Sequence, residues 1–266
     1  EMRSYRVSAQ VPTTTSPMTP TDLLLAALFF VIATLYSSVG HAGASGYIAA
    51  MALMSMPAAV VKPTALALNI LVAGIGIARF GAARLVPWRL VLPFVIASVP
   101  CAYFAARLQL PALWYQRLLA LVLLAAAVQL WRTAGRAMTV DADGQASPPP
   151  LWAALLAGAA IGVVSGLTGT GGAIFLTPLL LFARWMPTRE ASGVSVAFVW
   201  INSALGLAGL WKATGTLPAA LPWWLVAVGV GALLGTQLGI HRLPLKGLRY
   251  ALSAVLLIAA AKLLLG

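Results

Sequence analysis

Apolar runs, separated by short stretches that contain charges or prolines, occupy nearly the whole chain after residue 21. Of the 266 residues, 61% are hydrophobic and only 8% are charged. A soluble domain carries about 25% charged residues, because its surface faces water. Hydrocarbon must therefore solvate most of the outside of this chain, and we predict an all-α polytopic membrane protein.

The apolar runs divide into about ten predicted helical segments. Several of them are long enough to cross about 30 Å of hydrocarbon. The segments cover residues 22–37, 44–56, 63–79, 90–106, 110–131, 151–166, 172–184, 191–211, 218–240 and 246–265. Residues 44–56 and 172–184 are too few to cross comfortably, so we expect half-helices or short, tilted helices there.

This segmentation gives four regions. Residues 1–21 are a polar N-terminal tail rich in Ser, Thr and Pro, a composition typical of disordered segments. Residues 22–131 form a first transmembrane repeat and residues 151–266 a second. Residues 132–150 make a polar linker between them.

The two halves show the same order of features. Each has a first apolar run, a glycine-rich break, a short run, a proline and then three longer runs. The breaks cover residues 37–46 and 165–173. With one gap allowed, two glycines of each break and the proline after each short run align: Gly40 with Gly169, Gly43 with Gly172, and Pro57 with Pro187. We therefore predict an internal repeat.

Basic residues indicate how the halves are oriented. If each half crosses the membrane an odd number of times, one face receives more Lys and Arg, and basic loops favour the cytoplasm. The basic residues on that face are Arg79, Arg84, Arg89, Arg132, Arg136, Arg184, Arg189, Arg242, Lys246 and Arg249. If the first two runs of each half cross the membrane only once, the Lys and Arg residues divide almost evenly between the two faces. The odd count predicts inverted repeats with both termini outside.

The net charge of +12, from 17 Lys and Arg against 5 Asp and Glu, does not indicate a nucleic-acid partner. The basic residues are dispersed at the ends of apolar runs and are not clustered with aromatic residues on a polar face. That distribution is typical of topology signals and lipid head-group contacts, so the expected partner is the lipid bilayer.

Glycine-rich breaks at matching places in two halves predict a binding site near the membrane midplane. Glycine tolerates left-handed backbone conformations. A helix that begins inside the membrane directs unpaired N–H groups and a partial positive charge at whatever precedes it, so two such helices can bind an anion without a formal charge. The alternative is close helix packing through small residues. We favour binding because the breaks are paired, carry hydroxyls and lie next to short helices.

The predicted substrate-binding residues are glycines and hydroxyls of the two breaks, the histidine within the first break, and an asparagine from the third segment of each half. They are Ser38, Gly40, His41, Gly43, Asn69, Thr168, Gly169, Thr170, Gly171, Gly172 and Asn202.

His41 has three interpretations: it binds the anion, exchanges a coupling proton, or caps a helix. An ionisable group inside a membrane is a functional candidate by default. Thr170, at the matching place, cannot titrate, so a proton site at His41 is asymmetric. Asn69 and Asn202 each face either the cavity or a neighbouring helix, since a buried amide needs a partner.

Lys62 precedes Pro63, and proline favours the first turn of a helix. We therefore expect Lys62 at a helix start. Its ammonium either lies at a vestibule and attracts anions or reaches the membrane surface, and we favour the second interpretation.

The sequence predicts no enzyme, no cofactor and no metal site. None of the acidic residues pairs with a histidine at a useful spacing, and no nucleotide-binding loop occurs. An ATP-driven mechanism would therefore need another chain.

Three stretches carry a family resemblance: Val39-Gly40-His41-Ala42-Gly43 with Pro57, Leu167-Thr168-Gly169-Thr170-Gly171-Gly172-Ala173 with Pro178-Leu179-Leu180 and Pro187, and Lys62-Pro63-Thr64-Ala65-Leu66-Ala67-Leu68-Asn69. Through them the chain resembles the sulfite exporter TauE/SafE family of membrane transporters over about residues 22–265. The resemblance implies a bacterial inner-membrane carrier of sulfite, thiosulfate, sulfoacetate or other organosulfonates, by secondary transport that is open to proton coupling. The first half departs from the doubled glycine of the second.

Our main prediction is a secondary transporter of small sulfur-containing anions that works by alternating access; export is implied by the resemblance alone. Two alternatives stay open. A passive anion channel needs the same site without coupling. A membrane-embedded subunit of a sulfur-metabolising enzyme is the other, against which the lack of paired carboxylates, cysteine nucleophiles and metal-ligand clusters argues.

Overall fold

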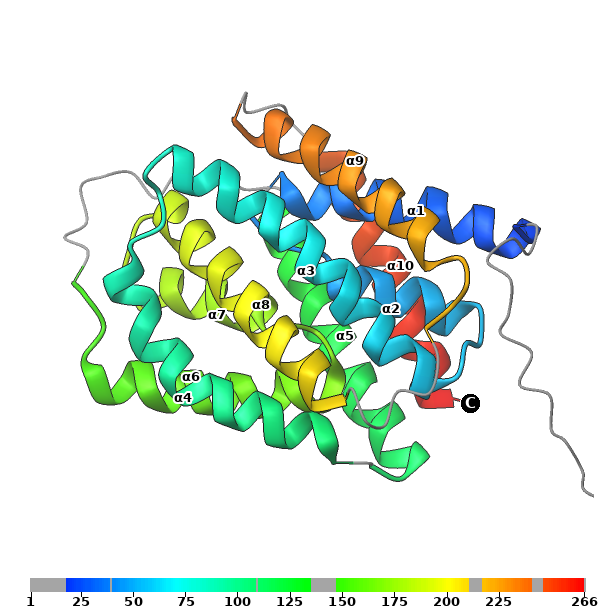
Figure 1. The fold of residues 1–266 in the computed structure, drawn as a ribbon, viewed down its shortest axis with the longest axis horizontal. Coiled ribbons are helices and arrows are strands. Elements are labelled where there is room, and N and C mark those ends of the chain that lie inside the picture. The colour runs from blue at the N-terminus through cyan, green and yellow to red at the C-terminus, as the bar shows by residue number, and fades with distance from the viewer. Residues whose placement is uncertain are drawn as a thin grey trace, which may run out of the picture.

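The computed structural model describes residues 18–38, 40–108, 110–134, 147–210, 217–240 and 246–265, and α-helix is the main element throughout these residues (Figure 1). The helices are α1 (Pro20–Ser37), α2 (Ala44–Leu53), α3 (Ala58–Ala82), α4 (Trp88–Arg107), α5 (Ala112–Ala134), α6 (Leu151–Thr168), α7 (Ala173–Phe182), α8 (Thr188–Leu210), α9 (Leu221–Ile240) and α10 (Lys246–Leu265). Each predicted segment corresponds to one helix, so the all-α prediction is confirmed.

Within the described residues, seven helices are long and apolar enough to cross a membrane. The side chains on the outside of these helices are themselves apolar. On α4, for example, Leu92, Ile96 and Phe104 are each more than half exposed, which suits a surface in contact with lipid tails and not with water. The chain is a multi-pass membrane protein.

The two short helices were predicted at the right places. α2 and α7 have 10 residues each, about 15 Å of helix, which is half of the hydrocarbon thickness. Each follows a glycine with a left-handed backbone, Gly43 at φ 96° and Gly172 at φ 91°. A side chain would strain that conformation, which is why the chain changes direction at these glycines.

The start of α3 differs from the prediction. The helix begins at Ala58 after the N-cap Pro57, so Pro63 lies inside it and not in its first turn. Lys62 is buried, and its Nζ donates a hydrogen bond of 2.9 Å to the carbonyl oxygen of Ala106. The expectation of an ammonium at the membrane surface is therefore wrong. A proline inside a membrane helix is tolerated where neighbouring groups satisfy the backbone that it leaves unpaired.

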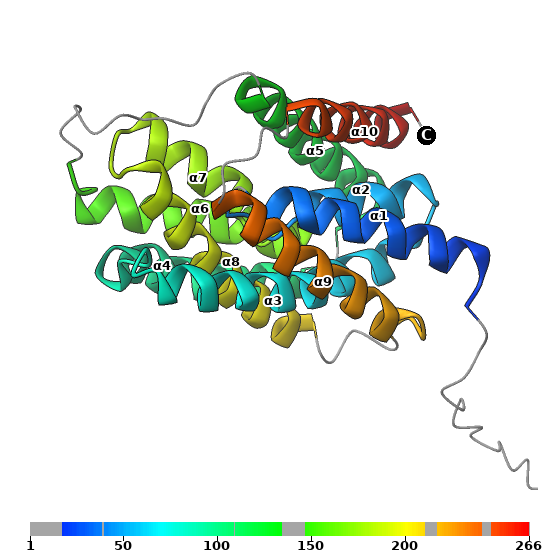
Figure 2. The same cartoon turned by 90° about the horizontal axis from the view of Figure 1, so that it is seen from above.

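Helix packing brings the halves together. α4 packs along α6 and α1 packs along α9, while α3 crosses α8 and α5 packs on α10 (Figures 1 and 2). Number the helices of each half from one to five, so that α6 is helix one of the second half and α9 is its helix four. The α4–α6 pair then joins helix four of the first half to helix one of the second, and the α1–α9 pair joins helix one of the first half to helix four of the second. The remaining two pairs join helices of the same rank. Exchanging the halves therefore leaves this set of contacts unchanged.

Glycines allow the closest of these contacts. A Cβ atom at Gly158 of α6 would lie 2.2 Å from the carbonyl oxygen of Phe94 on α4, and one at Gly235 of α9 would lie 2.2 Å from that of Thr34 on α1. Backbones that approach this closely gain van der Waals contact along the whole crossing, which drives association of helices in lipid.

The two ends of the bundle carry different connections. The start of α1, the α2–α3 connection and the end of α10 lie at one end, and the α3–α4 and α7–α8 connections lie at the other (Figure 1). α3 and α8, which cross, therefore begin at opposite ends of the molecule.

We predict that Gly158→Ala destabilises the protein by about 1–3 kcal/mol, because the added methyl group overpacks a tight backbone contact. The melting temperature of the detergent-solubilised protein, read from the loss of its size-exclusion peak after heating, measures the effect. Gly81→Ala is the matched control, since its Cβ would meet nothing within 4 Å. Equal melting temperatures for the two variants would contradict this account of the α4–α6 contact.

Candidate functional site

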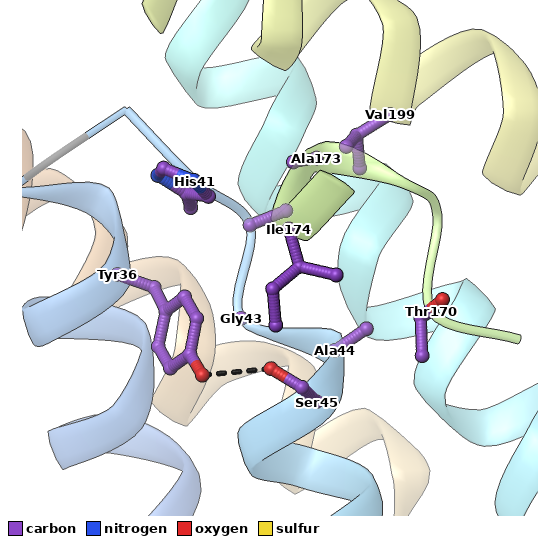
Figure 3. Close-up of a pocket in the computed structure, with 10 residues that line it drawn as sticks. Tyr36, His41, Gly43, Ala44, Ser45, Thr170, Ala173, Ile174 and Val199 are labelled. Carbon is purple, nitrogen blue, oxygen red and sulfur yellow. Dashed lines mark hydrogen bonds between the residues drawn. The ribbon is translucent and has the colours of Figure 1, made fainter. Parts of the chain in front are cut away.

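The two glycine-rich breaks border one pocket, although 129 positions separate Gly43 from Gly172 in the sequence (Figure 3). The pocket is small and partly open: its volume is about 10 Å³, which is room for about one water molecule. Its lining comes from the end of α1, the first break and α2, and from the second break, α7 and α8: Tyr36, His41, Ala42, Gly43, Ala44, Ser45, Thr170, Ala173, Ile174 and Val199.

The starts of α2 and α7 both contribute to this lining. Gly43 and Gly172 are the N-caps of the two helices, and neither offers a capping side chain. The first N–H groups of a helix have no partner inside it, and the helix dipole adds a partial positive charge there. In α7 the third of them, that of Phe175, donates to the carbonyl oxygen of Gly172 at 3.1 Å. Ala44 and Ser45 of α2, with Ala173 and Ile174 of α7, thus bring two positive helix ends to one cavity.

Aromatic residues support the first break. The hydroxyls of Tyr36 and Ser45 form a hydrogen bond of 2.7 Å across the break (Figure 3). Tyr47 donates its hydroxyl to the carbonyl oxygen of Ala42 at 2.9 Å. Both tyrosines are buried, so these bonds fix the path of the backbone between α1 and α2.

Threonines support the second break. The Oγ1 of Thr168 donates to the carbonyl oxygen of Val164 at 2.7 Å and lies 2.9 Å from the Oγ1 of Thr170. Thr170 is buried at 5% exposure and lines the pocket. Thr170 matches His41 of the first break, so a hydroxyl stands in one half where an imidazole stands in the other.

His41 lies at the pocket with 8% of its surface exposed. Its backbone N–H donates to the carbonyl oxygen of Tyr36 at 2.9 Å, and its ring meets the ring of Tyr36 edge to face at 6.3 Å between centroids. The histidine is therefore held beside both the tyrosine and the start of α2.

Asn69 of α3 lies behind the second break. Its Nδ2 donates to the Oγ of Ser203 on α8 at 3.3 Å, while its Oδ1 is buried without a partner. A Cβ atom at Gly171 would lie 2.7 Å from the Nδ2 of Asn69 and 2.9 Å from the Oγ of Ser203. The pair thus touches the backbone that continues into Thr170 of the pocket.

Asn202 does not join this group. Its Oδ1 accepts a hydrogen bond of 2.6 Å from Ser98 on α4, and its Nδ2 donates to the carbonyl oxygen of Phe198 at 2.9 Å. Both ends of the amide are satisfied by helices, as in the second interpretation of this residue. Asn69 and Asn202 also differ in their register from the starts of α3 and α8, so they are not equivalent positions.

Three further predicted residues shape the breaks without lining the pocket. The hydroxyl of Ser38 donates to the carbonyl oxygen of Leu35 at 2.7 Å and so closes the end of α1. Gly40 and Gly169 have φ values of 77° and 81°. A Cβ atom at Gly40 would lie 2.4 Å from the Cβ of Ser192, and one at Gly169 would lie 2.9 Å from the Cγ of Lys62.

Seven lining residues were not among the predicted site residues: Tyr36, Ala42, Ala44, Ser45, Ala173, Ile174 and Val199. Tyr36 precedes the first break and Ser45 lies within it, and both carry hydroxyls, a signal that could have been used. Ile174 and Val199 carry no such signal, since apolar residues are abundant in every segment. Within the described residues no group of three or more His, Cys, Asp or Glu side chains could hold a metal ion.

Comparison with known proteins gives the family. The model of the sulfite exporter TauE/SafE family matches residues 25–263. A protein of Sinorhizobium fredii, described as probable membrane transporter protein y4hK, is 43% identical over 242 residues, which cover 90% of this chain and 97% of the relative. No solved structure matches the chain.

A match over nearly the whole length, together with this degree of identity, leaves no large part of the chain outside the family. The family is one of transporters and not of enzymes. The chain is a multi-pass membrane protein that belongs to the sulfite exporter TauE/SafE family of membrane transporters.

Proposed function

We propose that the chain is a secondary transporter of small sulfur-containing anions, such as sulfite or organosulfonates, and that it works by alternating access. The observation that carries the proposal is the shared pocket, which the starts of α2 and α7 both border. The class of anion comes from the name of the family, which is that of a sulfite exporter.

The pocket has the chemistry that an oxyanion needs. Backbone N–H groups at two helix starts offer hydrogen bonds to its oxygens, and the hydroxyls of Ser45 and Thr170 lie within the same lining. None of the lining residues is acidic, so no side chain there repels an anion. Asn69 and Ser203, behind Gly171, add an amide and a hydroxyl that become available if the second break moves.

The backbone supports a repeat of residues 22–131 by residues 151–266. The φ values at equivalent positions are 77° and 81° for Gly40 and Gly169, and 57° and 54° for Ser55 and Arg184 after the short helices. The helix contacts also map onto themselves when the halves are exchanged. We infer inverted repeats, since α3 and α8 begin at opposite ends (Figure 1), and an inverted pair can expose one site to either face.

Charge supports an orientation in the bacterial inner membrane. Arg79 lies in the last turn of α3, and Arg84 and Arg89 follow it around the α3–α4 connection. Arg184 and Arg189 flank the α7–α8 connection at the same end. Basic connections favour the cytoplasm, so we assign this end to the cytoplasm and the opposite end, with the start of α1 and the end of α10, to the outside.

We propose His41 as the group that exchanges a coupling proton. It is the titratable side chain in the first break, it borders the pocket, and a proton on its ring would add a positive charge beside the bound anion.

We predict that the purified protein in liposomes carries sulfite or an organosulfonate down a gradient and that a pH gradient changes the rate. Radiolabelled anion flux measures both. Saturable flux that responds to the pH gradient supports secondary transport. Flux that ignores the pH gradient and appears as single-channel current would instead indicate a passive channel, and no flux of any tested sulfur anion would refute the proposal.

We predict that Thr170→Val raises the KM for the anion about tenfold, because a hydrogen bond to a charged group contributes about 1.5–3 kcal/mol. Thr236→Val is the matched control: its buried hydroxyl donates to the carbonyl oxygen of Ala232 within α9. An unchanged KM in Thr170→Val, with both variants folded, would remove Thr170 from the site.

We predict that His41→Gln keeps anion exchange but loses the response to a pH gradient, because glutamine preserves hydrogen bonding and cannot titrate. His241, the other histidine of the chain, lies outside the described residues and serves as the control in His241→Gln. A pH response that survives in His41→Gln would place the coupling proton elsewhere.

A further inference from the structure

Both breaks pack tightly on the opposite half, and one contact of each break involves the first part of a long helix. Gly40 of the first break packs on Ser192 of α8, and Gly169 of the second break packs on Lys62 of α3. Ser192 and Lys62 stand at the same place, since each is the fifth residue of its helix. The two contacts are therefore equivalent in position, but one of them carries a neutral hydroxyl and the other a cation.

The cation is set into the protein and not at its surface. Lys62 is 7% exposed, and the partner of its ammonium is the carbonyl oxygen of Ala106 at 2.9 Å. Ala106 lies in the last turn of α4, where the helix dipole is negative. Burying an ammonium is unfavourable unless it is well paired, and a single carbonyl leaves two of its three donors for another acceptor.

A carboxylate does not fill this role in the described residues. The acidic residues there are Asp22 in the first turn of α1 and Glu190 in the first turn of α8. Asp22 accepts hydrogen bonds from Thr19, and Glu190 lies at the end of the molecule where α8 begins, opposite to the start of α3 (Figure 1). Within the described residues, the ammonium of Lys62 thus has no carboxylate beside it, and a small anion has the charge to fill that place.

Lys62 lies close both to the pocket lining and to the start of α3. Its neighbour Gly169 is the residue before Thr170, which lines the pocket. As the fifth residue of α3, Lys62 lies about 6 Å along the helix axis from its first residue. Lys62 therefore lies two residue contacts away from the pocket lining, on the side of the second break that faces α3.

We propose that Lys62 forms an entry subsite for small oxyanions at the end of the protein where α3 begins, and that it gives this face a higher affinity for the transported anion than the face where Ser192 stands. The inference rests on the proposed function. Similar backbones in the two halves would not by themselves give the two faces different affinities for the anion. The inference adds such a difference, which we call sidedness, because Lys62 places a charge near one face and Ser192 places a hydroxyl near the other.

The test compares sulfite transport from the two faces in right-side-out and inside-out membrane vesicles that contain the full chain. Lys62→Gln removes the charge and keeps a hydrogen-bond donor, while Lys62→Arg keeps the charge. Lys262→Gln is the matched control. Lys262 also donates to helix-end carbonyls, those of Ala52 and Leu53, but it is exposed.

We expect Lys62→Gln to raise the KM about tenfold from the face where α3 begins and to leave the other face within twofold. Lys62→Arg and Lys262→Gln should both keep the sidedness of the unmodified protein. Equal changes at both faces, or no change, would overturn the subsite while leaving the proposed function intact. If the unmodified protein carries no sulfur anion, the proposed function and this inference are both wrong.

If Lys62→Gln does not fold, Ser192→Lys decides the question from the other side. A lysine there should lower the KM from the opposite face and reduce the difference between the faces. A folded Ser192→Lys protein with unchanged sidedness would overturn the inference.

Discussion

Backbone polar groups that leave a helix inside hydrocarbon must find partners within the protein, and the rest of the structure depends on how the two breaks meet this constraint. Residues 40–46 and 168–173 are buried throughout, so protein and not lipid surrounds them. The hydroxyl of Tyr47 donates to the carbonyl oxygen of Ala42 and so satisfies part of the non-helical backbone of the first break. Residues of the first turns of α2 and α7 line the pocket, and we propose that an anion binds there.

The sequence predicts well those features that a single residue or a long run determines. The helices follow from apolar runs, since lipid contact demands both length and apolar character. The left-handed turns at Gly43 and Gly172 follow from glycine itself. Lys62 and Asn202 were harder, because their roles depend on which helix packs beside them. The carbonyl of Ala106 and the hydroxyl of Ser98 lie far away in the sequence, and no local pattern indicates them.

The two halves have similar backbones at their breaks but different side chains. Gly171 has a φ of 74°, whereas the matching residue is Ala42, and the neighbouring positions carry Thr170 and His41. A common backbone gives both halves a helix start that favours anions. The side chains differ: His41 and two tyrosines lie at the first break, while threonines, Asn69 and Lys62 lie at the second. We propose that this difference makes the two faces of the carrier unequal.

The central claim is that an oxyanion binds between the starts of α2 and α7. A crystal of the protein grown with selenite, the selenium counterpart of sulfite, tests it most directly, because selenium gives an anomalous diffraction signal. We predict one strong selenium peak in the pocket, within hydrogen-bonding distance of N–H groups near Ser45 and Ala173. A well-ordered pocket without a selenium peak, or a peak bound only at the membrane surface, would contradict the account.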